Sequence, residues 1–235
     1  NTTVSVIDTK EFAFGDFAEN VGIRSYWKDI KIYYGYDAKP HSISKFNTNT
    51  VSGWIDNRIN DLFVDVFGNI VAATFGGLLY HNTKTGQTLV IDGHASDFDT
   101  TKSCSEQLTK CLLYSKLTTS VKWGKNGIWY VGTTAGCYYS KNAGKSWEIL
   151  FQDKLGSQII NCITTNSLGQ SIIGTNSDKI YIAHPNMSVP IEITTPFTGI
   201  RTVAVDDNNI IWAGTDYGLI RIENYNVIHT YNIAN

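Results

Sequence analysis

Short apolar runs alternate with brief polar or glycine-containing turns along most of this chain. Runs such as Asp61–Val66 and Arg201–Val205 alternate hydrophobic and polar positions. Each is followed, after a few Asn, Gly or Asp residues, by a second apolar run such as Ile70–Ala72 or Ile210–Ala213. Alternation with period two is typical of β-strands, and two apolar runs joined by such a turn are typical of β-hairpins. The pattern therefore predicts an all-β chain built from hairpins.

A Gly-Thr motif follows these hairpins and returns at nearly constant spacing. Thr133 and Thr175 are 42 residues apart, and Thr175 and Thr215 are 40 apart. The copies of the motif are Ala73–Gly77, Gly132–Gly136, Gly174–Asp178 and Gly214–Gly218. A fixed period near 40 residues is typical of stacked copies of one supersecondary unit.

Each copy of the motif is followed by two further strand-like segments. The third strands are expected at Leu78–Tyr80, Cys137–Tyr139, Ile180–Ile182 and Leu219–Ile222, and the fourth at Thr88–Ile91, Trp147–Leu150, Ile191–Ile193 and Val227–Tyr231. Glycine near the third position after Thr suits a tight turn with positive φ. Four antiparallel strands in each unit of about 40 residues predict the blades of a β-propeller.

A weaker copy of the unit lies near the N-terminus. It has strand-like segments at Ile30–Tyr36, His41–Phe46 and Val51–Ile55. We therefore expect residues 1–235 to form a single five-bladed β-propeller, with six blades including a degenerate N-terminal blade as the alternative. Val4–Ile7 or Phe12–Phe14 could pair with the last blade and close the ring.

The spacing between Thr74 and Thr133 is 59 residues, which exceeds one period. The surplus is an insertion at about 94–117, and long insertions in compact repeats are often functional. Cys104 and Cys111 lie within it, and they are either a disulfide or two free thiols on a short helix. Cys137 and Cys162 lie on predicted strands and are expected to be buried thiols.

Composition limits the classes of function. The net charge is −2 and only four arginines occur, so a nucleic-acid surface is not expected. No run of 18 apolar residues is present, so we expect no membrane insertion. The five histidines show no paired spacing, and no phosphate-binding or nucleophile-elbow motif occurs, so neither a metal nor a cofactor is predicted.

The segment Asp206–Leu219 resembles the propeller repeat of sensor domains in two-component regulators. The shared pattern is a turn, a short apolar run with Trp212, then Gly214-Thr215, two variable residues, Gly218 and an apolar residue. The other copies follow this pattern less closely, and Asp178 stands where the repeat has glycine. The resemblance implies the β-propeller fold, and the signalling role of those regulators is not carried over.

The segment Ser140–Trp147 resembles the Asp-box turn of sialidases and other propellers, with Asn142 in place of Asp and Ser146 in place of Thr. In that family the box is a structural hairpin, which implies that Trp147 is a packing residue. A sialidase-like site would need three clustered arginines. A glycosidase site would need a second carboxylate near the axis besides Asp61 and Asp65, and none is evident.

One face of such a propeller collects the turns between second and third strands and the connections between blades. Aromatic, amide and hydroxyl side chains gather there, and the expected ligand-binding residues are Tyr34, Tyr36, Arg58, Phe75, Asn161, Asn176, Arg201, Asp216 and Tyr217. Such a mixture suits a sugar or a protein loop. We therefore expect a non-catalytic, lectin-like binding domain that is secreted, periplasmic or displayed at the cell surface. A protein-interaction scaffold or adhesin, with the insertion as contact element, is the alternative, and a glycoside hydrolase or lyase is the third reading. The sequence leaves the oligomeric state open.

Overall fold

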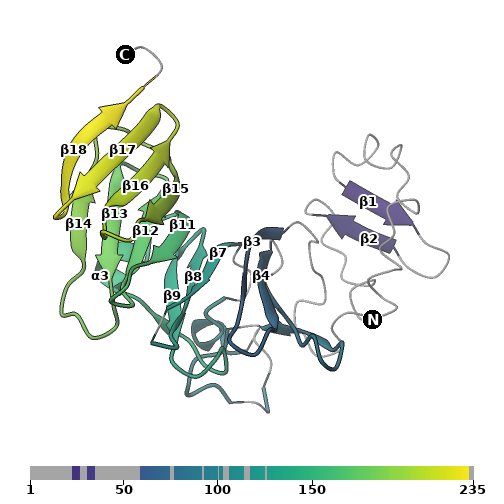
Figure 1. Cartoon of the computed structure of the whole chain (residues 1–235). Helices are drawn as coiled ribbons and strands as arrows, with labels where there is room; N and C mark the ends of the chain where they lie inside the picture. Colours follow the sequence, from purple (N-terminus) through teal and green to yellow (C-terminus); the bar gives the residue numbers. More distant parts are fainter. Residues whose placement is uncertain are drawn as a thin grey trace.

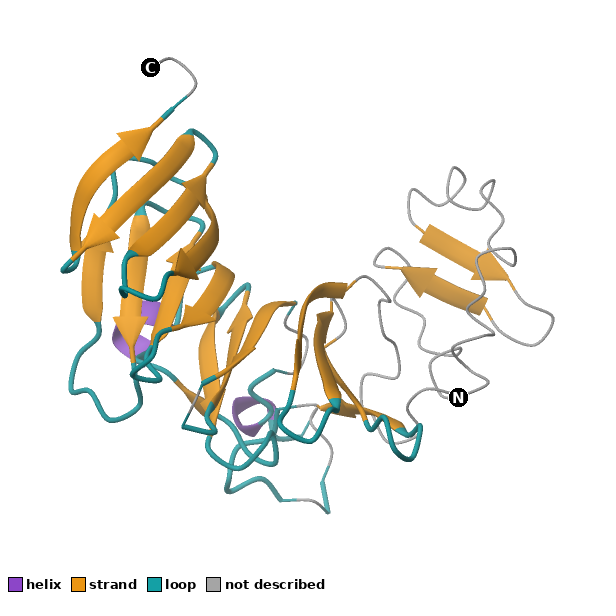
Figure 2. Ribbon diagram, viewed as in Figure 1, coloured by secondary structure: helices purple, strands orange, loops and turns teal. Residues whose placement is uncertain are grey.

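The computed structural model describes residues 23–26, 31–34, 59–74, 77–91, 93–99, 101–102, 106–113, 117–124 and 126–232. This part of the chain is almost entirely β-structure (Figure 2). Its helices are the single 3-10 turn η3 (Leu108–Lys110) and the four-residue α3 (Gln152–Leu155). The all-β prediction is therefore confirmed.

Sixteen of the described strands form four antiparallel sheets of four strands each, and each sheet is a simple meander. The first blade is β3 (Ile59–Val64), β4 (Ile70–Thr74), β5 (Gly77–His81) and β6 (Thr88–Ile91). The second is β7 (Thr118–Trp123), β8 (Trp129–Thr133), β9 (Gly136–Ser140) and β10 (Glu148–Ile149). The third is β11 (Ile160–Thr165), β12 (Ser171–Thr175), β13 (Lys179–Ala183) and β14 (Ile191–Thr194), and the fourth is β15 (Ile200–Val205), β16 (Ile211–Thr215), β17 (Gly218–Glu223) and β18 (Asn226–Tyr231).

The four blades follow one another in sequence order along an arc (Figure 1). The first strands β3, β7, β11 and β15 are neighbours from blade to blade, so they line the inner side of the arc. This arrangement is that of a β-propeller, as the repeat predicted. It also explains why residues about 40 positions apart meet in space.

The upstream copy of the repeat is described only in part. It contains the antiparallel hairpin of β1 (Ile23–Tyr26) and β2 (Lys31–Tyr34). The strands expected at His41–Phe46 and Val51–Ile55, and the closing strands expected at Val4–Ile7 or Phe12–Phe14, lie outside the described residues. The choice between five and six blades therefore stays a prediction.

The threonine of the Gly-Thr motif has the same role in every described blade. Its hydroxyl donates a hydrogen bond to the carbonyl of the residue that begins the third strand, at 2.8 Å for Thr74, 3.0 Å for Thr133, 2.7 Å for Thr175 and 2.9 Å for Thr215. In three blades that residue is a glycine with positive φ, for example Gly136 at 103°. In the third blade the acceptor is Lys179, one position further along, because this turn contains an extra residue. The longer turn explains why Asp178 can replace glycine.

Apolar side chains from facing blades pack together between the sheets. Between the third and fourth blades the core is mainly aliphatic, with Ile180 and Ile193 against Ile200 and Ile220. The other two cores are richer in aromatic side chains. The core between the second and third blades includes Tyr130, and the core between the first and second blades includes Trp129. Each blade therefore depends on the next for burial of one of its faces.

The insertion at about 94–117 is tied to the body of the propeller near both of its ends. His94 and Cys111 form a β-bridge, and the Leu113 side chain is buried against the core between the first two blades. Cys111 is disulfide-bonded, whereas Cys137 and Cys162 are free. Cys104, its expected partner, lies outside the described residues, so that pairing stays a prediction.

The turn between β9 and β10 is Ser140–Trp147. Asn142 Oδ1 accepts hydrogen bonds from the Ser140 hydroxyl and the Ser146 amide, both at 2.9 Å. Trp147 is buried, and its indole N–H donates to the Gly144 carbonyl at 3.1 Å. Asn142 is therefore the side-chain acceptor that closes this hairpin.

Candidate functional site

A polar hollow of about 270 Å³ lies along the first strands of the four blades. Four different strands contribute to it, because equivalent positions of β3, β7, β11 and β15 face the same inner space. Its lining residues are Asn60, Asp61, Thr119, Ser120, Lys122, Asn161, Cys162, Ile163, Thr164, Arg201, Thr202 and Val203. Asn161 and Arg201 of the predicted site are thus brought to one surface.

In the first three blades, the second residue of the first strand connects one blade to the next. The Asn60 amide donates to the Thr118 carbonyl at 2.7 Å, the Thr119 hydroxyl to the Ile160 carbonyl, and the Asn161 amide to the Ile200 carbonyl at 2.9 Å. Each acceptor is the first residue of the first strand in the next blade. The Asn161 amide nitrogen is therefore used within the fold, and its carbonyl oxygen is the atom it can offer to a ligand.

Asp61 connects the first two blades through its carboxylate. One oxygen accepts from the Ser120 hydroxyl at 2.6 Å and the Val121 amide at 3.0 Å, and the other contacts the Lys122 ammonium at 2.7 Å. Among the described residues that line the hollow, Asp61 is the sole carboxylate. Held in this way, it stabilises the packing of two blades and is poorly placed to act as a free acid or base.

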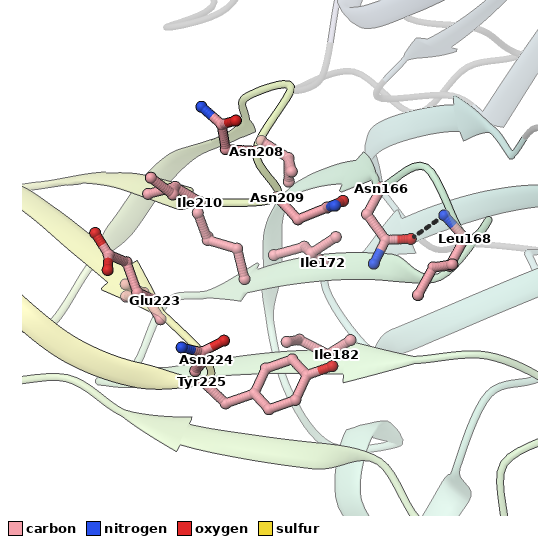
Figure 3. Close-up of a pocket in the computed structure, with 13 residues that line it drawn as sticks. Asn166, Leu168, Ile172, Ile182, Asn208, Asn209, Ile210, Glu223, Asn224 and Tyr225 are labelled. Carbon is pink, nitrogen blue, oxygen red and sulfur yellow. Dashed lines mark hydrogen bonds between the residues drawn. The ribbon is translucent and has the colours of Figure 1, made fainter.

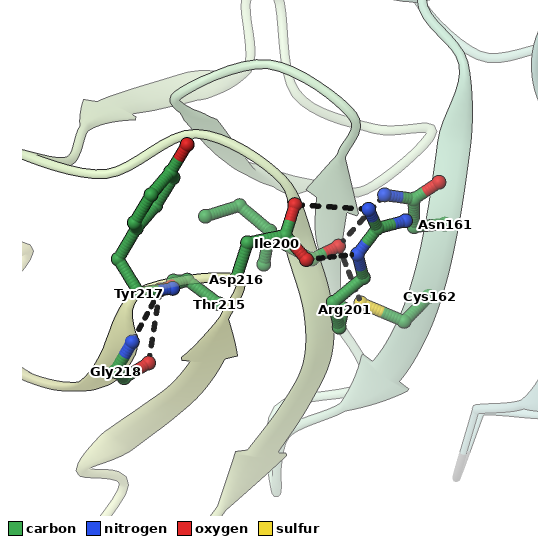
Figure 4. Close-up of polar contacts among 8 residues, drawn as sticks. All are labelled: Asn161, Cys162, Ile200, Arg201, Thr215, Asp216, Tyr217 and Gly218. Carbon is green, nitrogen blue, oxygen red and sulfur yellow. Dashed lines mark hydrogen bonds and ion pairs between the residues drawn. The ribbon is translucent and has the colours of Figure 1, made fainter. Parts of the chain in front are cut away.

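Arg201 departs from the connecting role of its equivalents. Its guanidinium forms a two-bonded pair with the Asp216 carboxylate, at 2.6 Å from Nε and 2.9 Å from Nη2 (Figure 4). The fold brings the two together because Arg201 follows the start of β15 and Asp216 lies in the turn between β16 and β17. A planar guanidinium and a carboxylate paired in this way are held in fixed orientation.

Tyr217 follows Asp216 in the same turn and is largely exposed, at 62% of its surface. Its ring projects on the side of Asp216 away from Arg201 in the view of Figure 4. The ring of Phe197, from the connection between the third and fourth blades, lies 6.1 Å away, centroid to centroid. The sequence prediction named Arg201, Asp216 and Tyr217 but not Phe197, which has no periodic signal because it lies between strands.

The charges at this surface are fixed near neutral pH. The hydrogen bond with Asp216 raises the pKa of the Arg201 guanidinium, and Arg201 in turn lowers the pKa of the Asp216 carboxyl. Burial raises the pKa of the Cys162 thiol in the hollow to about 12. Cys162 is therefore a neutral thiol, which is a weak nucleophile.

The remaining predicted residues are placed only in part. Asn176 is exposed in the turn between β12 and β13, and its backbone amide donates to the Ile159 carbonyl at 2.9 Å. Tyr34 ends β2. Tyr36, Arg58 and Phe75 lie outside the described residues, so their place in the site stays a prediction.

Other chemical groups at the described surface are sparse. No cluster of three or more His, Cys, Asp or Glu side chains with metal-binding geometry occurs in the described segments. No described helix is long and apolar enough to span a membrane. What the arrangement offers is hydrogen bonding, one exposed ion pair and one exposed aromatic ring.

Comparison with known proteins identifies the fold. No family model and no curated protein matches the sequence. Among solved structures, the chain resembles the extracellular domain of the hybrid two-component system BT3049 from B. thetaiotaomicron, with a TM-score of 0.59 and 18% identity over 76% of this chain and 23% of that one. The extracellular domain of BT4673 from the same organism gives 0.56 and 15% over 84% and 24%.

Virginiamycin B lyase from Staphylococcus aureus is also similar, with a TM-score of 0.54 and 11% identity over 76% of this chain and 58% of the lyase. At these identities the likeness establishes the β-propeller fold. The sensor-domain resemblance of Asp206–Leu219 is thus matched by the whole described fold. The chain spans about a quarter of the length of the two sensor domains.

Proposed function

We propose that this chain is a non-catalytic β-propeller domain that binds a carbohydrate at the surface formed by Arg201, Asp216 and Tyr217. The observation that carries the proposal is an exposed aromatic ring beside an exposed, two-bonded Arg–Asp pair. A sugar can place its apolar face on such a ring while its hydroxyls bond to fixed charged groups. The polar hollow that begins at Arg201 extends the surface toward Asn161.

The similar solved structures support a binding role and an extracellular or periplasmic location. Two of them are extracellular domains of two-component systems. The lyase is an enzyme of the same fold, but the single carboxylate in the described part of the hollow is occupied by Ser120, Val121 and Lys122. A binding domain therefore accounts for the described surface with fewer assumptions than a hydrolase or lyase.

A glycan array probed with the intact protein tests the proposal, followed by titration of any bound glycan with the variants Tyr217→Ala and Arg201→Ala. Each should weaken binding about tenfold or more, because removal of a central aromatic or arginine anchor costs on the order of 2 kcal/mol. Tyr231→Ala is the matched control. It removes a tyrosine of comparable exposure, 44%, from the outer strand β18 and should leave affinity unchanged.

Unchanged affinity in both site variants would place the glycan elsewhere. An array with no hits from folded protein would favour the protein-interaction alternative. In that case residues 95–107 of the insertion are the segment to remove before a partner capture experiment. Its charged side chains include Asp97, which pairs with Lys110 just beyond the segment, 2.9 Å away.

A further inference from the structure

A second cleft, of about 410 Å³, lies between the third and fourth blades. It opens among the turns that join first to second strands and third to fourth strands, so it lies at the opposite end of the blades from the Gly-Thr turns. Figure 3 shows Ile172 and Ile182 at its centre, with Asn166 and Leu168 on one side and Glu223–Tyr225 on the other. None of these residues belongs to the surface around Arg201.

The cleft results from a change in side-chain type at two equivalent positions. Tyr130 and Tyr139 stand opposite each other in the second blade, and Ile172 and Ile182 occupy the same two positions in the third. Both tyrosines are buried against the next blade. Ile172 and Ile182 are buried by the packing around them, but isoleucine lacks the ring and the hydroxyl that reach the turns of the next blade, and the cleft opens above them among those turns.

The hydroxyl of Tyr130 has a specific partner in the next blade. It donates to the Gly169 carbonyl at 3.1 Å. Asn209 is the equivalent of Gly169 in the fourth blade, since both have positive φ and both donate their amide to the residue three positions earlier. Within the described residues no donor reaches the Asn209 carbonyl, and Asn209 lines the cleft. The fourth blade thus has, at Asn209, a carbonyl equivalent to the one that Tyr130 bonds at Gly169, but the third blade has no tyrosine to reach it.

The rim of the cleft suits a peptide. Leu168 and Tyr225 are exposed apolar walls, at 72% and 47% of their surfaces. The side-chain amides of Asn208 and Asn224 line the cleft and have no partner among the described residues, and a carboxamide can both donate to and accept from a backbone. The lining carboxylate, Glu223, is paired with Arg221, so the cleft presents no unpaired charge. The isoleucines beneath the cleft are buried and carry no polar group for the hydroxyls of a sugar.

We propose that this cleft binds a tyrosine side chain presented by a segment of a partner protein. The ring takes the place that Tyr130 takes one interface earlier, its hydroxyl donates to the Asn209 carbonyl, and Asn208 and Asn224 bond the flanking backbone. The site is separate from the carbohydrate surface and does not depend on it.

Titration of the intact protein with N-acetyl-tyrosinamide, followed by two-dimensional amide NMR, tests the proposal. Shifts should be confined to residues around 166–170, 206–210 and 223–226. N-acetyl-phenylalaninamide should bind roughly fivefold more weakly, because it lacks one hydrogen bond of ordinary strength. 4-Methylphenol, which has the ring and hydroxyl but no peptide groups, should also bind more weakly. Equal binding of all three probes, or shifts elsewhere, would overturn the proposal.

Two variants test the site itself. Ile172→Tyr places at this position the tyrosine that the second blade has, and should abolish binding, whereas His229→Tyr adds a tyrosine on the exposed outer strand and should leave binding intact. The double variant Leu168→Ala/Tyr225→Ala removes only exposed walls and should weaken binding at least fivefold even if Ile172→Tyr does not fold. Full affinity in the double variant would contradict the assignment.

Discussion

Gly132 and Gly174 occupy the same position in consecutive blades, and each leaves room for an isoleucine of the next blade. A methyl group at Gly132 would lie 2.5 Å from Ile160 Cγ2, and one at Gly174 would lie 2.7 Å from Ile200 Cγ2 and 2.5 Å from Cys162 Sγ. In the first blade the position is Ala73, and the next blade begins with the smaller Thr118. The glycine of the motif is therefore required by the close contact between blades. The threonine is required by the turn, which its hydroxyl closes.

We predict that Gly174→Ala lowers the free energy of unfolding by about 1–3 kcal/mol, the usual cost of overpacking a close contact. Chemical denaturation at constant m-value measures it. Gly214→Ala is the matched control, because among the described residues its added methyl group would meet only Thr202 of its own blade, at 2.8 Å. Equal losses in the two variants would show that the contact with Ile200 is not what excludes a side chain.

At the scale of elements, the insertion at about 94–117 combines an exposed part with a part of the core. Leu113 is buried beside Trp129 and Trp147, and the Trp147 amide donates to the His94 carbonyl at 2.9 Å. The sequence indicated an insertion because the spacing between Thr74 and Thr133 exceeds the period. The period carries no information on which residues of the insertion are packed against the body. An experiment that removes the whole segment would therefore disturb the fold as well as any contact surface.

We predict that Leu113→Ala lowers the free energy of unfolding by about 2–4 kcal/mol, because it opens a cavity between the first two blades. Leu117→Ala, at a leucine 37% exposed in the same insertion, should cost less than half as much. Thermal and denaturant unfolding of both variants measure the difference. Similar small losses would mean that the insertion contributes little to the core.

At the scale of the whole molecule, several ionisable groups have a lower pKa in the folded chain than in the unfolded one, and each makes the free energy of unfolding decrease as the pH falls. Burial lowers the pKa of His94 and His184. Hydrogen bonds, chiefly from Lys179 to Glu192 and from the Ile210 backbone to Asp206, lower the pKa of those carboxyls. In each case the unfolded chain binds a proton at higher pH than the folded one, so stability falls as pH falls.

We predict that Tm declines from neutral pH in two stages. The first begins below the ordinary histidine pKa of 6.5, and the second, steeper stage begins below the ordinary glutamate pKa of 4.5 and continues as the carboxyls protonate in the folded state. Scanning calorimetry between pH 7 and pH 3 measures it. The variant Asp206→Asn should have a lower Tm than the natural protein at pH 7, and this difference in Tm should shrink toward pH 3, because Asp206 is then protonated in the natural protein as well. A difference in Tm that stays constant with pH would show that the Asp206 carboxylate does not contribute to the pH dependence.

The sequence by itself determined the strands, their order within each blade and the stacking of blades. Period-two alternation, turn residues and the recurrence of Gly-Thr are local signals, and a local hydrogen-bonding pattern such as Thr215 to Gly218 follows from them. It also predicted that Arg201, Asp216 and Tyr217 lie on one face of the propeller, because the repeat places their turns at the same end of the blade.

Only the tertiary structure decided how those polar residues are used. The sequence predicted Asn161 as a ligand contact, yet its side-chain amide donates to the Ile200 carbonyl of the next blade. Asp61, which the sequence placed near the axis, is likewise held by the groups of Ser120–Lys122 in the next blade. The cleft beside Ile172 was equally hidden, because it depends on which side chains face each other across two blades. Such contacts join residues about 40 positions apart, and their geometry is fixed by packing between sheets, which no local pattern encodes.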